Sequence, residues 1–489
     1  MDWLTVLPPV IAIAIVMWKK EVILALLLAV ASSEALLLLN NADASLLMTP
    51  INTIERIIST ISNVGNARIL LFSLLVGALL AFMRDSGGVT ATVNRLINSG
   101  IASTKRRVGS ITMFTGIVVF IESNLSVLAS GILARGLFDK FKMSRARLAY
   151  IIDSTSAPVC ILILLNGWGA YVLALLSNYP SEQSAVEILW NTLPYNIYAW
   201  LTLIVVAYTI FADKVHGPML IEEANMLTEQ DVDQTGRPIH HVSNPEPQNR
   251  LSEAKVEIGQ HRHLLQAGEA TKARFMLLPL GVMIFGMLGF MWWTGKGDIT
   301  QGSGSKSVLY ATFLACIIAY VMLLLHKRYT HQQSVKIGFN GMAELLPLVT
   351  IVMLSISLGA SLKILGTGIF VSGLVGSYLP VFLIVPMLFI SGGIISFTTG
   401  TSWGTFAILI PIGMPLVESL GLPPSLVLAA ILGGGIFGDH CSPISDTTAI
   451  SSLAAGCDLL THVKTQLPYA LVVGGITIVA YSMIGLVAL

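Results

Sequence analysis

The sequence has few charged residues and few cysteines for its length. Of its 489 residues 11% are charged and 54% are hydrophobic, and the mean hydropathy is +0.78. Water-soluble proteins carry about a quarter charged residues, so this composition is typical of a membrane protein. All four cysteines, Cys160, Cys316, Cys441 and Cys457, lie in or beside apolar segments. This placement predicts reduced thiols and not a disulfide framework.

The sequence also lacks a strong net charge and the motifs of ATP-driven or enzymatic chemistry. The formal charge is +1, which gives no indication of a nucleic-acid partner. We find no Gly-rich loop that ends in Lys and Ser or Thr, so ATP is not expected to drive the protein. Nor do we find a nucleophile–base pair or a set of metal ligands at catalytic spacing. We therefore expect neither an enzyme nor a resident cofactor.

Long apolar runs are what the sequence does contain. About 20 apolar residues are needed to cross roughly 30 Å of hydrocarbon. The runs predict an all-α polytopic membrane protein with about ten crossings, over residues 3–18, 22–39, 67–84, 146–178, 187–212, 274–294, 307–326, 342–362, 424–455 and 465–487. Of these, 146–178 and 424–455 are too long and too polar in the middle for plain helices, so we expect both to be broken.

Two further apolar stretches, residues 108–138 and 379–420, have polar centres. Each is either one broken crossing or a re-entrant hairpin. If both are hairpins, all but five of the 28 Lys and Arg residues share one side of the membrane, the five being Arg56, Arg68, Lys296, Lys306 and Lys363. The positive-inside rule therefore favours two hairpins, in a bacterial inner membrane with both termini outside the cytoplasm.

The order of these features repeats. Residues 67–212 contain the first hairpin (108–138) and the first broken helix (146–178), and residues 342–489 contain the second hairpin (379–420) and the second broken helix (424–455). Five crossings lie from residue 67, where the first repeat starts, to residue 342, where the second starts, so the repeats are expected to be inverted, with a central site that faces each side in turn. The remaining parts are an N-terminal scaffold (1–66), a hydrophilic cytoplasmic loop (213–273) and linking helices (274–341).

Polar side chains at membrane depth mark the expected site. Na⁺ prefers oxygen ligands, and a buried carboxylate costs about 2.5–3.5 kcal/mol to insert, so such residues are functional candidates. The candidate ion or substrate ligands are Glu122, Ser123, Asn124, Asp153, Ser154, Thr155, Ser156, Thr399, Thr401, Ser402, Asp439, Ser442, Ser445, Asp446 and Thr447. We expect Na⁺ at Asp153 and Asp439. His440 is a candidate for proton relay, and the alternative for it is a structural hydrogen-bonding role. The alternative for both aspartates is to cap the N-termini of broken helices. Glu34 is expected to be interfacial.

At these residues the sequence resembles the NhaC-type Na⁺/H⁺ antiporters. Residues 438–448 read GDHCSPISDTT, residues 148–160 read LAYIIDSTSAPVC, residues 399–405 read TGTSWGT and residues 462–469 read HVKTQLPY. The resemblance runs from about residue 67 to the C-terminus. It implies a scaffold domain, a transport domain with two hairpins and two broken helices, a homodimer and an elevator-like movement. One departure is the first hairpin tip, where Ser123 and Asn124 follow Glu122 in place of further acidic residues.

Two functions are compatible with this pattern. One carboxylate holds either a proton or Na⁺ but rarely both, which favours a secondary Na⁺/H⁺ antiporter that works by alternating access. The alternative is Na⁺- or H⁺-coupled transport of a small organic acid or an amino-acid-like solute, held by the polar tips. A channel is less favoured because it has no need of two inverted, interrupted sites.

Overall fold

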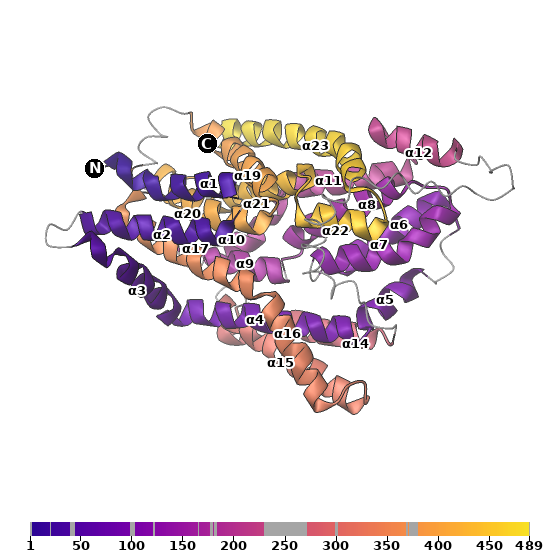
Figure 1. Cartoon of the computed structure of the whole chain (residues 1–489), viewed down its shortest axis with the longest axis horizontal. Helices are drawn as coiled ribbons and strands as arrows, with labels where there is room; N and C mark the ends of the chain where they lie inside the picture. Colours follow the sequence, from indigo (N-terminus) through magenta and orange to yellow (C-terminus); the bar gives the residue numbers. More distant parts are fainter. Residues whose placement is uncertain are drawn as a thin grey trace.

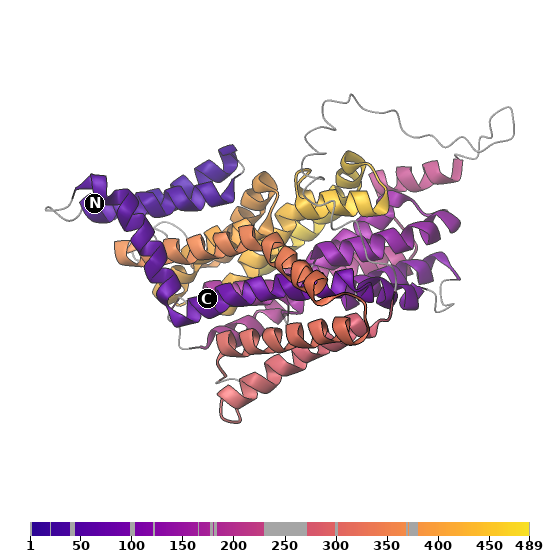
Figure 2. The same ribbon diagram turned by 60° about the horizontal axis from the view of Figure 1, so that its bottom comes forward.

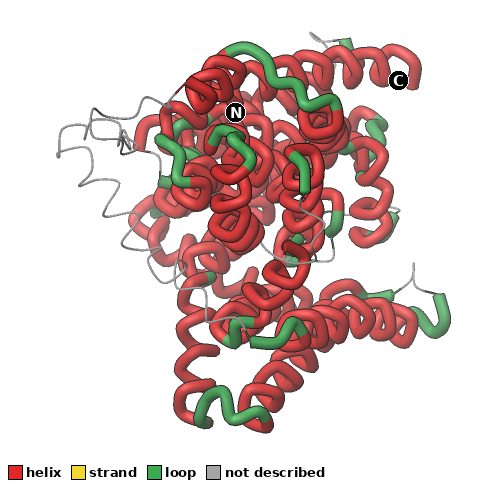
Figure 3. The backbone as a smooth tube through the Cα atoms, turned by 90° about the vertical axis from the view of Figure 1, so that its right-hand side faces the viewer, coloured by secondary structure: helices red, strands yellow, loops and turns green. Residues whose placement is uncertain are grey.

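The computed structural model describes residues 2–19, 21–39, 45–97, 103–120, 123–164, 166–176, 179, 183–228, 271–298, 302–367, 370 and 380–488. Figure 3 shows helices joined by loops, with no strand in these ranges. The predicted all-α class is therefore confirmed. Most of the expected 213–273 loop lies outside the described residues.

The first half of the chain contains α1 (Leu7–Lys19), α2 (Val22–Leu39), α3 (Thr49–Ser62), α4 (Val64–Asp85), α5 (Gly88–Ile97), α6 (Lys105–Val118), α7 (Ser123–Lys140), α8 (Arg145–Leu162), α9 (Gly167–Leu176), α10 (Ala185–Asn191), α11 (Ile197–Phe211) and α12 (Pro218–Thr228). The second half contains α14 (Arg274–Thr294), α15 (Gly304–Leu325), α16 (His331–Glu344), α17 (Leu346–Leu365), α19 (Ile384–Thr399), α20 (Ser402–Leu420), α21 (Pro424–Cys441), α22 (Asp446–Ala455) and α23 (Leu459–Ala488). Short 3₁₀ turns lie at Asp2–Val6, Leu46–Met48, Leu193–Tyr195 and Val381–Leu383.

Nine helices among the described residues are long and apolar enough to cross a membrane, and the bent pair α8–α9 makes a tenth. The chain is thus a multi-pass membrane protein. Two expected crossings, 3–18 and 187–212, form shorter apolar helices. In the expected hairpin 379–420, by contrast, α19 with its preceding turn and α20 are each as long as a full crossing.

The α6–α7 and α19–α20 pairs lie in opposite halves of the molecule (Figure 1). The first pair packs on α8 and the second on α21. Glycine permits close contact between α19 and α21, because a Cβ on Gly434 would lie 2.3 Å from the carbonyl oxygen of Phe389. Each pair also touches the helix that follows the other break, since α22 packs on α7 and α9 packs on α20. The two halves therefore interlock around the middle of the molecule.

Helices α14 and α15 form an arm beside α4 and α16 (Figure 2). The contact between α4 and α16 is close at Gly77, where an added Cβ would lie 2.2 Å from the carbonyl oxygen of Gly341. Near this crossing Arg84 makes a bidentate pair with Glu344 at 2.8 and 2.9 Å. The close glycine contact and the bidentate ion pair together fix the crossing of α4 and α16.

The expectation that Glu34 is interfacial was wrong. Its side chain is buried in α2 and accepts hydrogen bonds from Arg56 Nε at 2.6 Å and from Ser361 Oγ at 2.7 Å. A buried charge is tolerated when it is paired and hydrogen-bonded, and here the partners come from α3 and α17.

Candidate ion and substrate site

Asp153 lies inside the continuous helix α8, and the residues after it do not form the expected break. The hydroxyl of Thr155 donates to the carbonyl of Ile151 at 2.6 Å, and that of Ser156 donates to the carbonyl of Asp153 at 3.0 Å. Such back-bonding lets a helix run through Ser and Thr. The helix breaks only after Leu162, and α9 then leaves at an angle of 49°. Expecting unwound backbone at Asp153 was therefore wrong.

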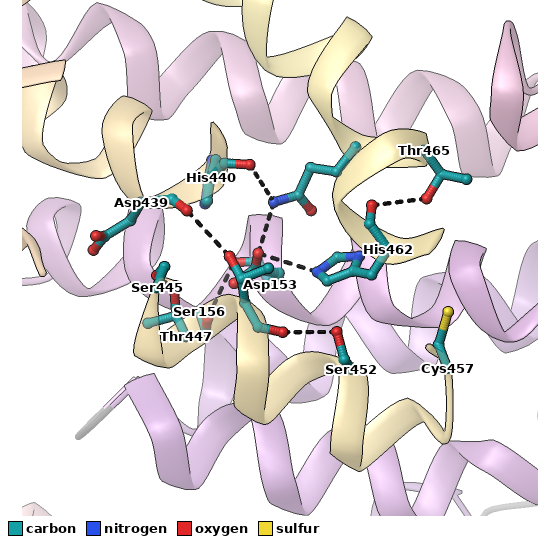
Figure 4. Close-up of polar contacts among 12 residues, drawn as sticks. Asp153, Ser156, Asp439, His440, Ser445, Thr447, Ser452, Cys457, His462 and Thr465 are labelled. Carbon is teal, nitrogen blue, oxygen red and sulfur yellow. Dashed lines mark hydrogen bonds and ion pairs between the residues drawn. The ribbon is translucent and has the colours of Figure 1, made fainter. Parts of the chain in front are cut away.

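The carboxylate of Asp153 has partners on one oxygen only. Its Oδ2 accepts a hydrogen bond from Gln466 Nε2 at 2.7 Å and lies 3.4 Å from His462 Nε2. Its Oδ1 is buried and has no hydrogen-bond partner in the described part of the chain. Figure 4 shows Asp153 facing His462, which extends from α23. A fully buried carboxylate thus keeps one bare oxygen.

Three neighbouring polar atoms share this property. His440 Nε2, His462 Nδ1 and Gln466 Oε1 are buried and have no partner among the described residues. Buried polar groups are normally hydrogen-bonded, so a cluster of exceptions needs an explanation such as an ion, a proton site or ordered water. The cluster is tied together by Gln466, whose Nε2 also donates to the carbonyl of His440 at 3.1 Å.

A small cavity of about 10 Å³, roughly the space of one water molecule, adjoins this cluster. His440, Gln466 and Ser154 line it, together with the aromatic residues Tyr150 and Tyr198 and other side chains. His440 is held there by a 2.9 Å hydrogen bond between its Nδ1 and the Tyr198 hydroxyl. The cavity therefore offers polar room next to the atoms that lack partners.

Asp439 has a different environment, because both of its oxygens are occupied. Oδ1 accepts from Ser396 Oγ at 2.8 Å and Oδ2 accepts from the backbone N–H of Ser402 at 3.1 Å. Ser402 is the first residue of α20, whose N-cap residue Thr401 makes no side-chain cap of its own. Asp439, near the end of α21, therefore caps the N-terminus of a different helix, α20, and not a helix end in its own broken segment. Figure 4 shows its carboxylate pointing away from Asp153.

The break between α21 and α22 is bonded to the α19–α20 turn. Ser442 Oγ donates to the carbonyl of Phe397 at 2.7 Å, and the N–H of Asp446 donates to the carbonyl of Gly400 at 3.3 Å. The other candidates of this half bond locally, Thr399 with Thr401, Ser445 with Thr447, and the Asp446 side chain with the N–H of Thr447. The structure thus brings together the second-half candidates that the sequence had grouped.

The turn directly after α6, at residues 119–120, contacts the break after α8. The side chain of Asn166 donates to the carbonyls of Phe120 and Cys160, both at 3.0 Å. Ser123 is buried and Asn124 is half-buried at the start of α7. Glu122 lies outside the described residues.

A cleft of about 290 Å³ lies between the start of α7 and the α19–α20 turn. Asn124 reaches it from the start of α7, and Thr401 and Trp403 from the α19–α20 turn. The rest of its lining comes from α4, from α9, where Trp168 and Tyr171 face it, and from the α16–α17 junction near Glu344. Residues from both halves therefore share one large space, whereas Asp153 does not line it.

Three site residues were missed by sequence reasoning: His462, Gln466 and Ser396. His462 and Gln466 are spaced four residues apart, which places both on one face of α23. Two polar residues at this spacing, at the start of an apolar segment, indicate a polar face on the helix and could have identified both residues. Ser396 gave no such signal, because a single Ser in an apolar helix is usually a packing residue.

The arrangement suits a weakly held cation or a proton better than a resident metal. Among the described residues no three His, Cys, Asp or Glu side chains converge into a metal-binding group. None of the four cysteines forms a disulfide within the described residues, and burial raises the pKa of the Cys457 thiol, in the turn before α23, to about 12. This thiol stays protonated at neutral pH and is therefore a poor metal ligand.

Comparison with known proteins agrees with this chemistry. The Na⁺/H⁺ antiporter family matches residues 159–486 of the chain. An uncharacterized protein of Haemophilus influenzae is 30% identical over 447 residues, which cover 86% of this chain and 79% of that protein. The resemblance inferred from the sequence motifs is therefore confirmed.

Shorter matches come from proteins with named substrates. The malate-2H⁺/Na⁺-lactate antiporter of Bacillus subtilis is 37% identical over 105 residues, 22% of each chain. The arginine/ornithine antiporter of Halobacterium salinarum is 36% identical over 107 residues, 21% of each chain. In fold, the chain resembles the YdaH transporter of Alcanivorax borkumensis, with a TM-score of 0.56, 13% identity and coverage of 97% and 98%.

Proposed function

Because the chain belongs to the Na⁺/H⁺ antiporter family, we propose that it is a secondary active antiporter that exchanges Na⁺ for protons at Asp153. The observation that carries this proposal is the bare Oδ1 of Asp153 in a fully buried site. A buried carboxylate with no permanent cationic partner is stabilised either by a proton or by a small cation. Competition between the two at one oxygen couples their movements.

The neighbouring groups support this exchange. A cation at Oδ1 would find the bare Gln466 Oε1 close to the same carboxylate, which Gln466 already contacts through Nε2. His440 and His462 each offer a ring nitrogen without a partner, and histidine changes charge near physiological pH. These rings would accept the proton that Asp153 releases when Na⁺ binds. His440 faces the small cavity, which provides a polar route to this proton site.

We further propose that α6–α7 and α19–α20 are re-entrant hairpins of two inverted repeats. Their positions in opposite halves of the molecule and their equivalent packing on α8 and α21 support this arrangement. Asp439 then sets the shape of the second hairpin tip by capping α20. Alternating access would move the hairpins and broken helices as one unit against the remaining helices, in a homodimer with both termini outside the cytoplasm.

Reconstitution tests the exchange directly. Liposomes that contain the purified protein and an internal pH-sensitive dye should become alkaline inside when Na⁺ is added outside, because Na⁺ enters as protons leave. An equal concentration of choline should have no effect. Equal proton flux in Na⁺ and in choline would overturn the proposal.

A second candidate function is favoured by the size of the cleft. About 290 Å³ is far more room than Na⁺ needs, and it lies at the lower end of the roughly 300–1,000 Å³ that is typical of small-molecule sites. Cation-coupled or proton-coupled transport of an organic solute would use this space, as the names of the two short-match antiporters illustrate. Uptake of a labelled organic solute that depends on Na⁺ or on a pH gradient is the measurement that distinguishes it.

A further inference from the structure

The cleft between the two hairpin tips has walls of a particular chemistry. Four aromatic residues line it, and three of them, Trp168, Tyr171 and Trp403, form one group. Their rings lie close together, with centroid distances of 4.6 Å between the two tryptophans and 4.9 Å between Tyr171 and Trp403. Tyr171 also donates its hydroxyl proton to the carbonyl of Trp403 at 2.7 Å, which ties α9 to the second tip. The result is a preformed aromatic wall.

Two polar atoms at this wall have no partner in the described part of the chain. They are the indole Nε1 of Trp168, whose side chain is 1% exposed, and Oδ1 of Asn124. One is a donor and the other an acceptor. Since buried polar groups rarely stay unpaired, both fit a ligand that accepts one hydrogen bond and donates another.

The charges around the cleft favour a cationic ligand. None of its described lining residues is Lys, Arg or His, and Glu344 is a lining residue. The nearby Arg84 is already engaged by two carboxylates, Glu344 at 2.8 Å and Asp85 at 2.9 Å. Two carboxylates and one guanidinium leave a net negative charge on the side of the cleft near Glu344. An organic anion would therefore find no free cation, whereas an ammonium group finds aromatic faces and acceptors.

We propose that this cleft binds a small organic ammonium compound, held by cation–π contact with Trp403 and Trp168 and by a hydrogen bond to Asn124. This proposal rests on the proposed antiport function, because it identifies the organic solute as a cation that moves in exchange for protons. The ammonium group donates to the Asn124 oxygen, and a hydroxyl or carbonyl oxygen of the same compound accepts from the Trp168 indole.

Binding to the purified protein in detergent tests the proposal without any transport measurement. Benzylammonium, benzyl alcohol and benzoate share one ring and differ in charge. A ligand that binds the folded state raises the unfolding midpoint with concentration, which gives an apparent Kd. We expect benzylammonium to bind at least about tenfold more tightly than the other two, and equal or tighter binding of benzoate would overturn the proposal.

A matched pair of variants locates the site. Trp403→Ala should weaken benzylammonium binding about 5- to 30-fold, since it removes one aromatic face. Trp293→Ala removes a tryptophan that is 64% exposed and lies outside the cleft, and it should leave binding unchanged. Equal losses in both variants would overturn the assignment. If Trp403→Ala does not fold, the comparison of the three ligands on the natural protein still tests whether the protein selects an ammonium compound.

The outcome separates the two proposals. Selective ammonium binding together with Na⁺-independent proton flux would end the Na⁺/H⁺ proposal and leave the cleft assignment standing. Na⁺-driven proton flux without selective ammonium binding would overturn the cleft assignment and leave the Na⁺/H⁺ proposal standing.

Discussion

Asp153 and Asp439 are both fully buried aspartates in apolar helices, yet their surroundings are opposite. Asp439 has a protein hydrogen bond on each oxygen, whereas Asp153 has contacts on one oxygen and none on the other. A satisfied carboxylate acts as a structural cap. A half-satisfied carboxylate in a polar cluster is able to bind and release a ligand. Two buried aspartates, one in each half of the chain, thus have different hydrogen-bonding environments.

The largest expected effect is that of Asp153→Asn. The amide binds neither a proton nor Na⁺ as a carboxylate does, so Na⁺-dependent proton flux in liposomes should fall to background. Asp139→Asn is the matched control, because Asp139 pairs with Arg145 at an exposed site and should retain full flux. Normal flux in Asp153→Asn would remove this residue from the exchange site.

Asp439→Ala should affect stability more than ion affinity. It leaves the N–H of Ser402 and the hydroxyl of Ser396 without their acceptor, which costs about 1–3 kcal/mol for each buried donor. Thermal unfolding in detergent should show a lower midpoint, and hydrogen exchange should increase at residues 399–405. The Km for Na⁺ in the remaining flux should change little. A stable Asp439→Ala protein with a greatly raised Km would reverse the roles of the two aspartates.

Gln466→Ala should weaken Na⁺ binding by roughly tenfold. The change removes a hydrogen bond to a buried carboxylate, worth about 1.5 kcal/mol, so the proton competes better with Na⁺. The Km for Na⁺ should rise most at low pH, where protons are abundant. Thr465→Ala is the control, because that hydroxyl bonds only the carbonyls of its own helix. An unchanged Km in Gln466→Ala would separate Gln466 from ion binding.

The smallest expected effect is on stability, and it tests whether the backbone N–H or the side-chain hydroxyl of Ser402 stabilises the fold. Ser402→Pro removes the N–H that Asp439 accepts, and proline is well tolerated at the first position of a helix. We expect it to lower stability by about 1 kcal/mol in thermal unfolding. Ser402→Ala keeps the N–H and should be close to neutral. Greater destabilisation by Ser402→Ala would show that the hydroxyl, and not the cap, is what matters.

The second half of the site was more predictable than the first. Ser442 and Asp446 lie beside Phe397 and Gly400, and both groups stood out in the sequence because Gly, Pro and Thr interrupt apolar runs there. In the first half the Ser and Thr of 153–156 suggested an interruption, but back-bonding keeps α8 helical through them. Local composition therefore gave the same signal for two different structures.

The sequence by itself determined the class of the protein and the position of its apolar helices. Those properties follow from length, periodicity and burial of local segments, and the family follows from motifs a few residues long. Only the tertiary structure decided which atoms are left without partners. The partners of Asp153 lie 309 and 313 residues away in the chain, and the cap that Asp439 provides is on a different helix. Hydrogen-bond satisfaction depends on packing between distant segments, and that packing gave both oxygens of Asp439 a partner and left Oδ1 of Asp153 without one among the described residues.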